Sequence, residues 1–151
     1  MEETLRALQE REEVLDVVND LFVGTDDRDW DRVRDVLAPR VLFDVESMTG
    51  SEPETLDAAD IVARWEEGLR PIRAVHHQTG NFRVRVSGDE ADVFCYGTAT
   101  HYRPTPSGRN TRTFVGSYDF HLLRSGDRWR IDVFRLNLKY VDGNLELEKE
   151  G

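Results

Sequence analysis

The sequence has a single cysteine, no long apolar run, and fewer basic than acidic residues. Cys95 has no partner for an internal disulfide, and one cysteine cannot form a cysteine metal cluster. No apolar stretch approaches the roughly 18 residues that suggest a membrane span. The 20 Lys and Arg residues are outnumbered by 30 Asp and Glu residues, which gives a net charge of −10. Such acidity disfavours binding to nucleic acid or to an anionic membrane, because phosphate recognition needs concentrated positive charge.

The N-terminal segment MEETLRALQEREE also lacks the basic stretch and apolar stretch of a secretory signal. Cys95 lies in the strand-like context DVFCYG, where a free cysteine behaves as a small buried apolar residue. These features favour a cytoplasmic protein in a reducing environment. With 151 residues, 38% apolar and 33% charged, the chain is expected to form one globular domain over 1–151.

Three amphipathic helices are predicted in the first half of the chain. Apolar residues recur at helical spacing over 4–23, and Gly24 is predicted to end that helix. A second short helix is expected at 29–37 and a third at 56–69. Between these two, VLFDVES has the composition of a strand, whereas TGSEPET is predicted to be a loop.

The second half of the chain has the pattern of an antiparallel sheet. FRVRV at 82–86 alternates apolar and basic residues, and the segments SGDE and SGDR are typical of tight hairpin turns. The apolar phase of the last strand changes between Val133 and Phe134, which predicts a β-bulge. The tail NLELEKEG is expected to be frayed. A solvated rim is expected around the long hairpin, formed by Arg103, Arg109 and Arg112.

Helices followed by a strongly curved antiparallel sheet indicate an α+β fold, in which the sheet wraps around a pocket and the helices cover it. The acidic cluster at 26–31 supplies candidate carboxylates for such a pocket, and the histidines of HHQTGN and the lone His101 are their candidate partners. Histidine removes a proton beside a carbonyl with little tuning of its pKa, and a carboxylate behind the ring fixes the tautomer and stabilises the imidazolium that forms. From the turn after the first helix, Asp26 can reach His77 on a strand beneath it.

Each of these residues also has a structural interpretation. Asp26 has the residue type of a helix N-cap, His77 can be a half-buried residue at a strand start, and His101 can be a satisfied core histidine. Because adjacent strand residues point to opposite faces, only one of His76 and His77 can face the pocket. His101 shares the phase of the inward residues of its strand if no bulge intervenes.

Four motifs, DDRDWDRVRDVLAP, HHQTGN, THYRP and GDRW, occur in an order that resembles the SnoaL-like members of the nuclear transport factor 2-like superfamily. The resemblance covers about residues 10–144, which it marks as the core of a single SnoaL-like domain. Within that superfamily, the scytalone dehydratases are the closest characterised likeness. The resemblance implies a cone-shaped α+β barrel with a deep apolar pocket and an activity without metal or organic cofactor. Carried over by position, it makes Asp26 and His77 the aspartate-supported base and His101 the second catalytic histidine.

The resemblance also marks substrate-binding positions. The family's two pocket tyrosines fall at Thr25 and Val45 in this chain. Its serine and asparagine on the third long strand fall at about Gly116 and Tyr118. Tyr118 and Tyr96 are expected to donate to a carbonyl oxygen in place of the missing tyrosines, or else to be core aromatics. The remaining candidates are the lining residues Trp65, Phe114 and Phe134, and Asn137, which is expected to cap the pocket or lie at an interface.

These observations favour a cofactor-independent, dehydratase-like lyase or isomerase that acts on a small apolar cyclic ketone or polyketide-like compound. A metal site made by Asp26, His77 and His101 is the less favoured chemistry. The alternative from another class is a non-catalytic ligand-binding or oligomeric scaffold protein with the same pocket, since a fold alone does not fix a function. A homodimer or homotrimer is expected, because exposed apolar sheet surface is common in this fold.

Overall fold

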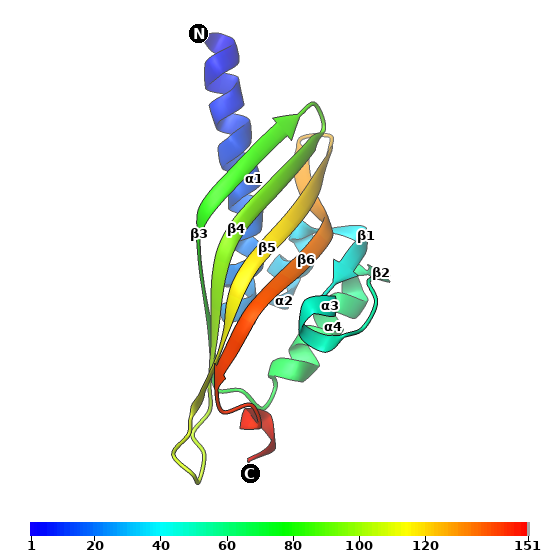
Figure 1. The fold of residues 1–151 in the computed structure, drawn as a ribbon. Coiled ribbons are helices and arrows are strands. Elements are labelled where there is room, and N and C mark those ends of the chain that lie inside the picture. The colour runs from blue at the N-terminus through cyan, green and yellow to red at the C-terminus, as the bar shows by residue number, and fades with distance from the viewer. Residues whose placement is uncertain (151) are drawn as a thin grey trace.

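The computed structural model describes residues 1–150, and its helices cover one face of a strongly twisted sheet (Figure 1). The elements are, in chain order, α1 (Glu2–Asp26), α2 (Trp30–Val36), β1 (Leu37–Asp44), α3 (Glu46–Thr49), β2 (Glu54–Asp57), α4 (Ala58–Leu69), β3 (Ala74–Ser87), β4 (Glu90–Tyr102), β5 (Thr111–Ser125), β6 (Arg128–Gly143) and the 3-10 helix η1 (Leu147–Lys149). The six strands lie in the order β2-β1-β6-β5-β4-β3, so the curved sheet is open, with β2 and β3 at its edges. Strands β1 and β6 are parallel and all other neighbours are antiparallel. The predicted α+β architecture is confirmed.

Helix α1 continues past Gly24, so the prediction that this glycine ends the helix was wrong. A Cβ atom at position 24 would lie 3.1 Å from Cγ2 of Val33. The glycine therefore allows α1 and α2 to pack closely, and the packing outweighs its weak helix propensity. The first turns of α1 extend beyond the sheet, and the apolar stripe that packs on the sheet begins further along, at Val14, Val18, Leu21 and Phe22.

Asp26 is the last residue of α1 and not a residue of the following turn. The N-cap of α2 is Asp29, whose side chain accepts a hydrogen bond from the backbone N–H of Arg32 at 3.2 Å. The structural interpretation of Asp26 as a helix N-cap is therefore wrong. Its side chain is free to turn toward the sheet.

The first half of the chain holds one strand that the sequence pattern did not indicate. The segment predicted as a loop continues into β2, which pairs with β1 along Arg40–Phe43. An ion pair of 2.8 Å between Arg40 and Asp57 joins the two strands. Helix α4 starts directly after β2, at Ala58, two residues later than predicted.

The strong curvature of the sheet arises at bulges in its long strands. The pairing of β5 with β6 skips Asp132 and Lys139 of β6. Asp132 immediately precedes the phase change at Val133 and Phe134, so the predicted bulge is confirmed. A further register shift in β3 accompanies Asn81, which has a φ of 56°. These irregularities bend the sheet around the helices.

The C-terminal tail is packed against the end of the sheet, and the prediction that it is frayed was wrong as far as Glu150. Leu147 is fully buried in a small apolar cluster with Ile72 and Val75. The guanidinium of Arg103 donates to the carbonyl of Leu147 at 3.0 Å. The prediction that Arg103 belongs to a solvated rim was therefore also wrong. A buried leucine and side-chain contacts from the sheet, including the bond from Arg103 and the ion pair of Arg112 with Glu148, thus hold a charged tail that has no strong pattern of its own.

The main core lies between the concave face of the sheet and α1, α2 and α4. Cys95 is fully buried within it, as its strand context predicted. Within residues 1–150, no helix is long and apolar enough to span a membrane.

Candidate active site

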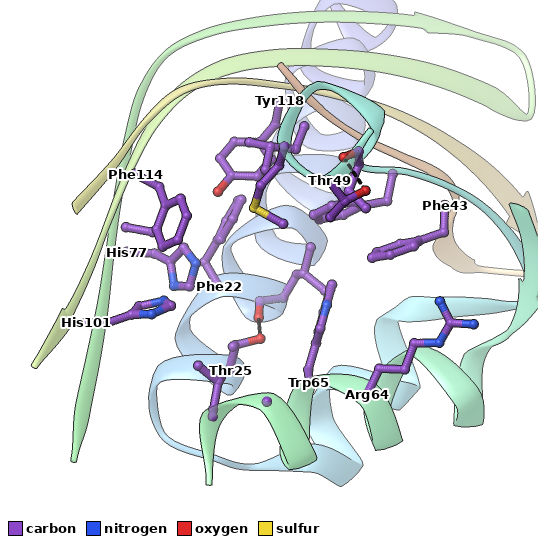
Figure 2. A pocket seen from close by; sticks show the side chains of 18 of the residues that line it. Phe22, Thr25, Phe43, Thr49, Arg64, Trp65, His77, His101, Phe114 and Tyr118 are labelled. Atoms are coloured by element: carbon purple, nitrogen blue, oxygen red, sulfur yellow. Dashed lines mark hydrogen bonds between the residues drawn. The ribbon is translucent and has the colours of Figure 1, made fainter. Parts of the chain in front are cut away.

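A cavity of about 440 Å³ opens between the concave face of the sheet and helices α1 and α4 (Figure 2). Both candidate histidines line it, His77 from β3 and His101 from β4. Six of the predicted binding residues line it as well: Thr25, Val45, Trp65, Phe114, Tyr118 and Phe134.

Aromatic contacts build much of the wall. Phe134 stacks on Phe43 with ring centroids 5.3 Å apart and meets the edge of Trp65 at 5.4 Å. On the side nearer the histidines, Phe22 packs edge-on against Tyr118 at 4.9 Å. Such interlocked rings form a fixed apolar surface, which suits a small, flat and largely apolar molecule.

The central contact of the site joins Asp26 to His77. Oδ1 of Asp26 lies 2.6 Å from Nδ1 of His77, and Oδ2 accepts the backbone N–H of the same histidine at 2.8 Å. The side chains are 16% and 14% exposed, so both groups are largely shielded from water. The carboxylate therefore fixes the ring through Nδ1 and leaves Nε2 for the cavity.

The strand register brings the two histidines to one face. His77 lies opposite Ala99 on β4, two positions from His101. Strand β4 pairs with β5 without a break, so His101 keeps the inward phase that the sequence predicted. His76 points the other way and is exposed.

His101 is paired with an arginine from the neighbouring strand. It lies directly opposite Arg112 on β5, and Nη2 of Arg112 lies 3.1 Å from Nδ1 of the imidazole. Burial, the charge of Arg112 and that of His77 lower the pKa of His101 to about 4. His101 is therefore neutral at physiological pH.

Arg112 lines the cavity, and its assignment to a solvated rim was wrong. Its side chain is only 13% exposed and forms an ion pair with Glu148 of η1. It shares the alternation phase of Phe114 and Tyr118, which is the sequence signal that places it inward. The packed C-terminal tail, which supplies Glu148, keeps it from solvent.

The pocket-lining hydroxyl groups of Thr25 and Tyr118 have different hydrogen-bonding roles. Oγ1 of Thr25 donates to the carbonyl of Leu21 at 2.7 Å, so its proton is committed to the helix. Tyr118 is 6% exposed, and burial raises the pKa of its hydroxyl, which stays protonated. Tyr118 is thus the phenol that can donate into the cavity.

Two predicted binding residues lie elsewhere. Tyr96 is 46% exposed on the opposite face of β4, where Nζ of Lys139 lies 4.8 Å from its ring centre. Asn137 lies between inward residues of β6, and its amide donates to Asp119 at 2.8 Å and to Ser117 at 3.2 Å. Both pocket assignments failed on strand parity, because these residues alternate with those that face the cavity. The alternative that Asn137 lies at an interface stays a prediction.

Sequence patterns also missed several lining residues. Among them are residues on three helices: Phe22 of α1, Met48 and Thr49 of α3, and Arg64 and Leu69 of α4. Among residues 1–150, no group of three or more His, Cys, Asp or Glu side chains is arranged to hold a metal ion.

Comparisons with known proteins agree with this architecture. The profile of the SnoaL-like domain family matches residues 6–135, and the chain belongs to that family. This confirms the resemblance seen in the sequence. None of the proteins with curated descriptions that were compared matches the chain significantly.

Three solved structures illustrate the likeness of fold. The Kfla4162 protein of Kribbella flavida is 26% identical, with a TM-score of 0.89 over 95% of this chain and 99% of that one. A putative scytalone dehydratase of Novosphingobium aromaticivorans is 15% identical, with a TM-score of 0.81 over 93% and 91%. A type 2 hexachlorocyclohexane dehydrochlorinase, LinA, is 18% identical, with a TM-score of 0.75 over 93% of each chain.

Proposed function

We propose that the protein is a cofactor-independent lyase or isomerase in which His77, oriented by Asp26, removes a proton beside the carbonyl of a small cyclic compound. The observation that carries this proposal is the Asp26–His77 contact of 2.6 Å in the wall of an apolar cavity. A neutral histidine with its Nδ1–H donated to a carboxylate presents a basic Nε2. The aspartate then stabilises the imidazolium that forms.

The reaction class follows from what such a base does. His77 takes the proton from carbon, and the electrons of the C–H bond move toward the carbonyl. In a lyase these electrons form a carbon–carbon double bond as a hydroxyl leaves the next carbon with its bonding pair and is protonated to water. In an isomerase the proton returns to a different carbon of the same molecule.

The other polar groups of the cavity support this chemistry. His101 and the protonated hydroxyl of Tyr118 line the same space and can donate to the carbonyl or to the leaving hydroxyl. Aromatic walls exclude water and strengthen these hydrogen bonds. Two of the similar structures are named as a putative scytalone dehydratase and a dehydrochlorinase, names that denote eliminations. These features favour a dehydratase-like activity on an apolar cyclic ketone or polyketide-like compound.

The test is turnover of a panel of cyclic hydroxyketones, followed by the absorbance of the conjugated product. On a compound that the wild-type protein converts, His77→Ala is expected to lower the rate by about 10²–10⁴-fold. His76→Ala is the matched control, because His76 is exposed and precedes His77 on the same strand. Circular dichroism checks that both variants fold. If His77→Ala converts the compound as fast as His76→Ala, His77 is not the base.

Self-association stays a prediction. A homodimer or homotrimer is proposed because aromatic side chains lie exposed on the strands, Tyr96 and Tyr140 among them. Sedimentation equilibrium distinguishes the two assemblies from a monomer.

A further inference from the structure

A row of charged and polar side chains runs along one wall of the cavity, from α1 through β3, β4 and β5 to η1. It begins with Asp26 and His77 and ends with Glu148, which forms an ion pair with Arg112. The middle of the row is the contact of 3.1 Å between Nη2 of Arg112 and Nδ1 of His101. Figure 2 shows the rings of His77 and His101 side by side in the cavity wall.

The chemistry of this middle contact allows only one arrangement of protons. A guanidinium carries only hydrogen-bond donors and keeps its charge at any ordinary pH. Nδ1 of His101 must therefore be the acceptor and carry no proton. The ring is then neutral, and its single proton is on Nε2.

Contacts on several sides hold the guanidinium of Arg112 beside His101. The guanidinium lies 5.2 Å from the ring centre of Phe114, and the side chain is 13% exposed. Glu148 accepts from Nη1, while Nη2 faces His101. Arg112 thus contacts His101 from the strand position directly opposite, with its second nitrogen held by the tail.

We infer that Arg112 is a positioning residue that holds His101 as a neutral imidazole with its proton on Nε2, so that His101 serves the cavity as a hydrogen-bond donor. In the proposed mechanism His77 has the opposite arrangement: its Nδ1 donates to the carboxylate of Asp26, 2.6 Å away, and Nε2 of the neutral ring is the acceptor. One wall of the cavity therefore offers one basic nitrogen and one N–H donor. The site is suited to a compound with an acceptor oxygen close to an acidic C–H group; this catalytic reading rests on the proposed function, whereas the protonation of His101 does not.

The charges around His101 act in both directions. His77 on β3 and Arg112 on β5 disfavour protonation of the ring, as does burial. Glu148 on η1 and Asp26 on α1 favour it. Arg112 contacts the ring directly, so its removal takes away the nearest positive charge. The carboxylates of Glu148 and Asp26 then stabilise the protonated ring more effectively, and the pKa of His101 is expected to rise.

The inference is tested on the ligand-free protein by long-range ¹H–¹⁵N correlation spectra of the histidine rings. His101→Gln identifies the signals of that ring among the four histidines. In the wild-type protein, His101 is expected to show protonated Nε2 and unprotonated Nδ1, and to stay neutral down to a pKa of about 4. A proton on Nδ1, or a midpoint at the ordinary histidine value of about 6.5, overturns the inference.

Arg112→Met keeps the aliphatic part of the side chain and removes the donor and the charge. The midpoint of His101 is expected to rise by about one pH unit or more. Arg109→Met is the matched control, because Arg109 is exposed on the same hairpin and is expected to leave the midpoint unchanged. An unchanged midpoint in Arg112→Met overturns the inference. Should Arg112→Met fail to fold, the wild-type spectrum still decides the tautomer.

Turnover separates this inference from the proposed function. If the wild-type spectra show the expected tautomer while no ketone is converted, the proposed function fails and the role of Arg112 stands. If ketones are converted through His77 but His101 carries its proton on Nδ1, the role of Arg112 fails alone.

Discussion

Asp26 holds His77 at both its side chain and its backbone. One carboxylate oxygen lies 2.6 Å from Nδ1, and the other accepts the backbone N–H at 2.8 Å. The two residues are 51 positions apart, at the end of α1 and near the start of β3. The same carboxylate thus ties a helix end to an edge strand and sets the orientation of a ring in the cavity wall.

Replacing this carboxylate by an amide separates its two tasks. In Asp26→Asn, an amide oxygen can still accept the backbone N–H of His77, so the fold is expected to persist. The charge that stabilises the imidazolium is lost, and turnover is expected to fall by about 10²–10⁴-fold. The measurement is kcat/KM beside a circular dichroism spectrum, with the exposed neighbour Asp27→Asn as control. Equal rates in the two variants would show that the carboxylate takes no part.

The cavity wall depends on the absence of a side chain at Gly97. A Cβ atom there would lie 2.2 Å from Cε2 of Tyr118, whose ring crosses β4 at this point. Gly97→Ala must displace a buried ring and is expected to lower the free energy of unfolding by roughly 1–3 kcal/mol. Urea denaturation measures the loss.

A double-mutant cycle isolates the cause of that loss. In a Tyr118→Ala background, Gly97→Ala is expected to cost much less, because the ring that it displaces is gone. If the cost of Gly97→Ala is the same in both backgrounds, the ring contact is not its source.

The fold was predictable because its signals are local. The alternation of apolar and polar residues predicted the long strands, and the phase change at Val133 and Phe134 predicted a bulge that curves the sheet. Strand β2 was missed since its sequence, ETLD, has a single apolar residue and forms only by pairing with β1. Gly24 was misread because its role depends on the contact with Val33, which no local pattern encodes.

The site was predictable only in part, for a related reason. The spacing of Asp26 and His77 carries no periodic signal, and the family resemblance, not the local pattern, paired them. Arg112 was placed at the rim because a basic residue beside a hairpin is usually solvated. Its strand phase, shared with Phe114 and Tyr118, indicated an inward position, but the shielding of its charge depends on Glu148, which comes from a tail with no pattern of its own.

His121 links three strands through two carboxylates. Its Nδ1 lies 2.6 Å from Asp132 and its Nε2 lies 3.0 Å from Glu90. Burial opposes the charged ring, but the hydrogen bond and charge of Asp132, with the charge of Asp92, outweigh it and raise the pKa of His121. The folded protein therefore binds this proton more tightly than the unfolded chain.

Stability is expected to depend on pH through this group. The contribution of His121 is fully present below its unfolded pKa of about 6.5 and is lost as pH rises through the raised folded value. The difference in free energy of unfolding between wild type and His121→Gln should thus be larger at mildly acidic pH than at alkaline pH. A difference that grows toward alkaline pH would contradict this sign.

Cys95 is expected to be chemically inert in the native protein. It is fully buried, and burial followed by the charge of Asp119 raises the pKa of its thiol to about 12. The raised pKa leaves far less of the reactive thiolate at neutral pH than an exposed cysteine would have. Iodoacetamide at pH 8 should therefore label the guanidinium-unfolded chain and not the native one. Rapid labelling of the folded protein would show that the core opens at this strand.

The most direct test of the central claim measures proton abstraction alone. Cyclic ketones without a leaving group are incubated with the protein in D₂O, and loss of the ¹H signal beside the carbonyl is followed by NMR. The wild-type protein and His76→Ala are expected to accelerate this exchange, whereas His77→Ala is expected to return it to the rate in buffer. Exchange at the buffer rate with wild-type protein, for ketones that NMR shows to bind, would contradict the account, as would undiminished exchange in His77→Ala.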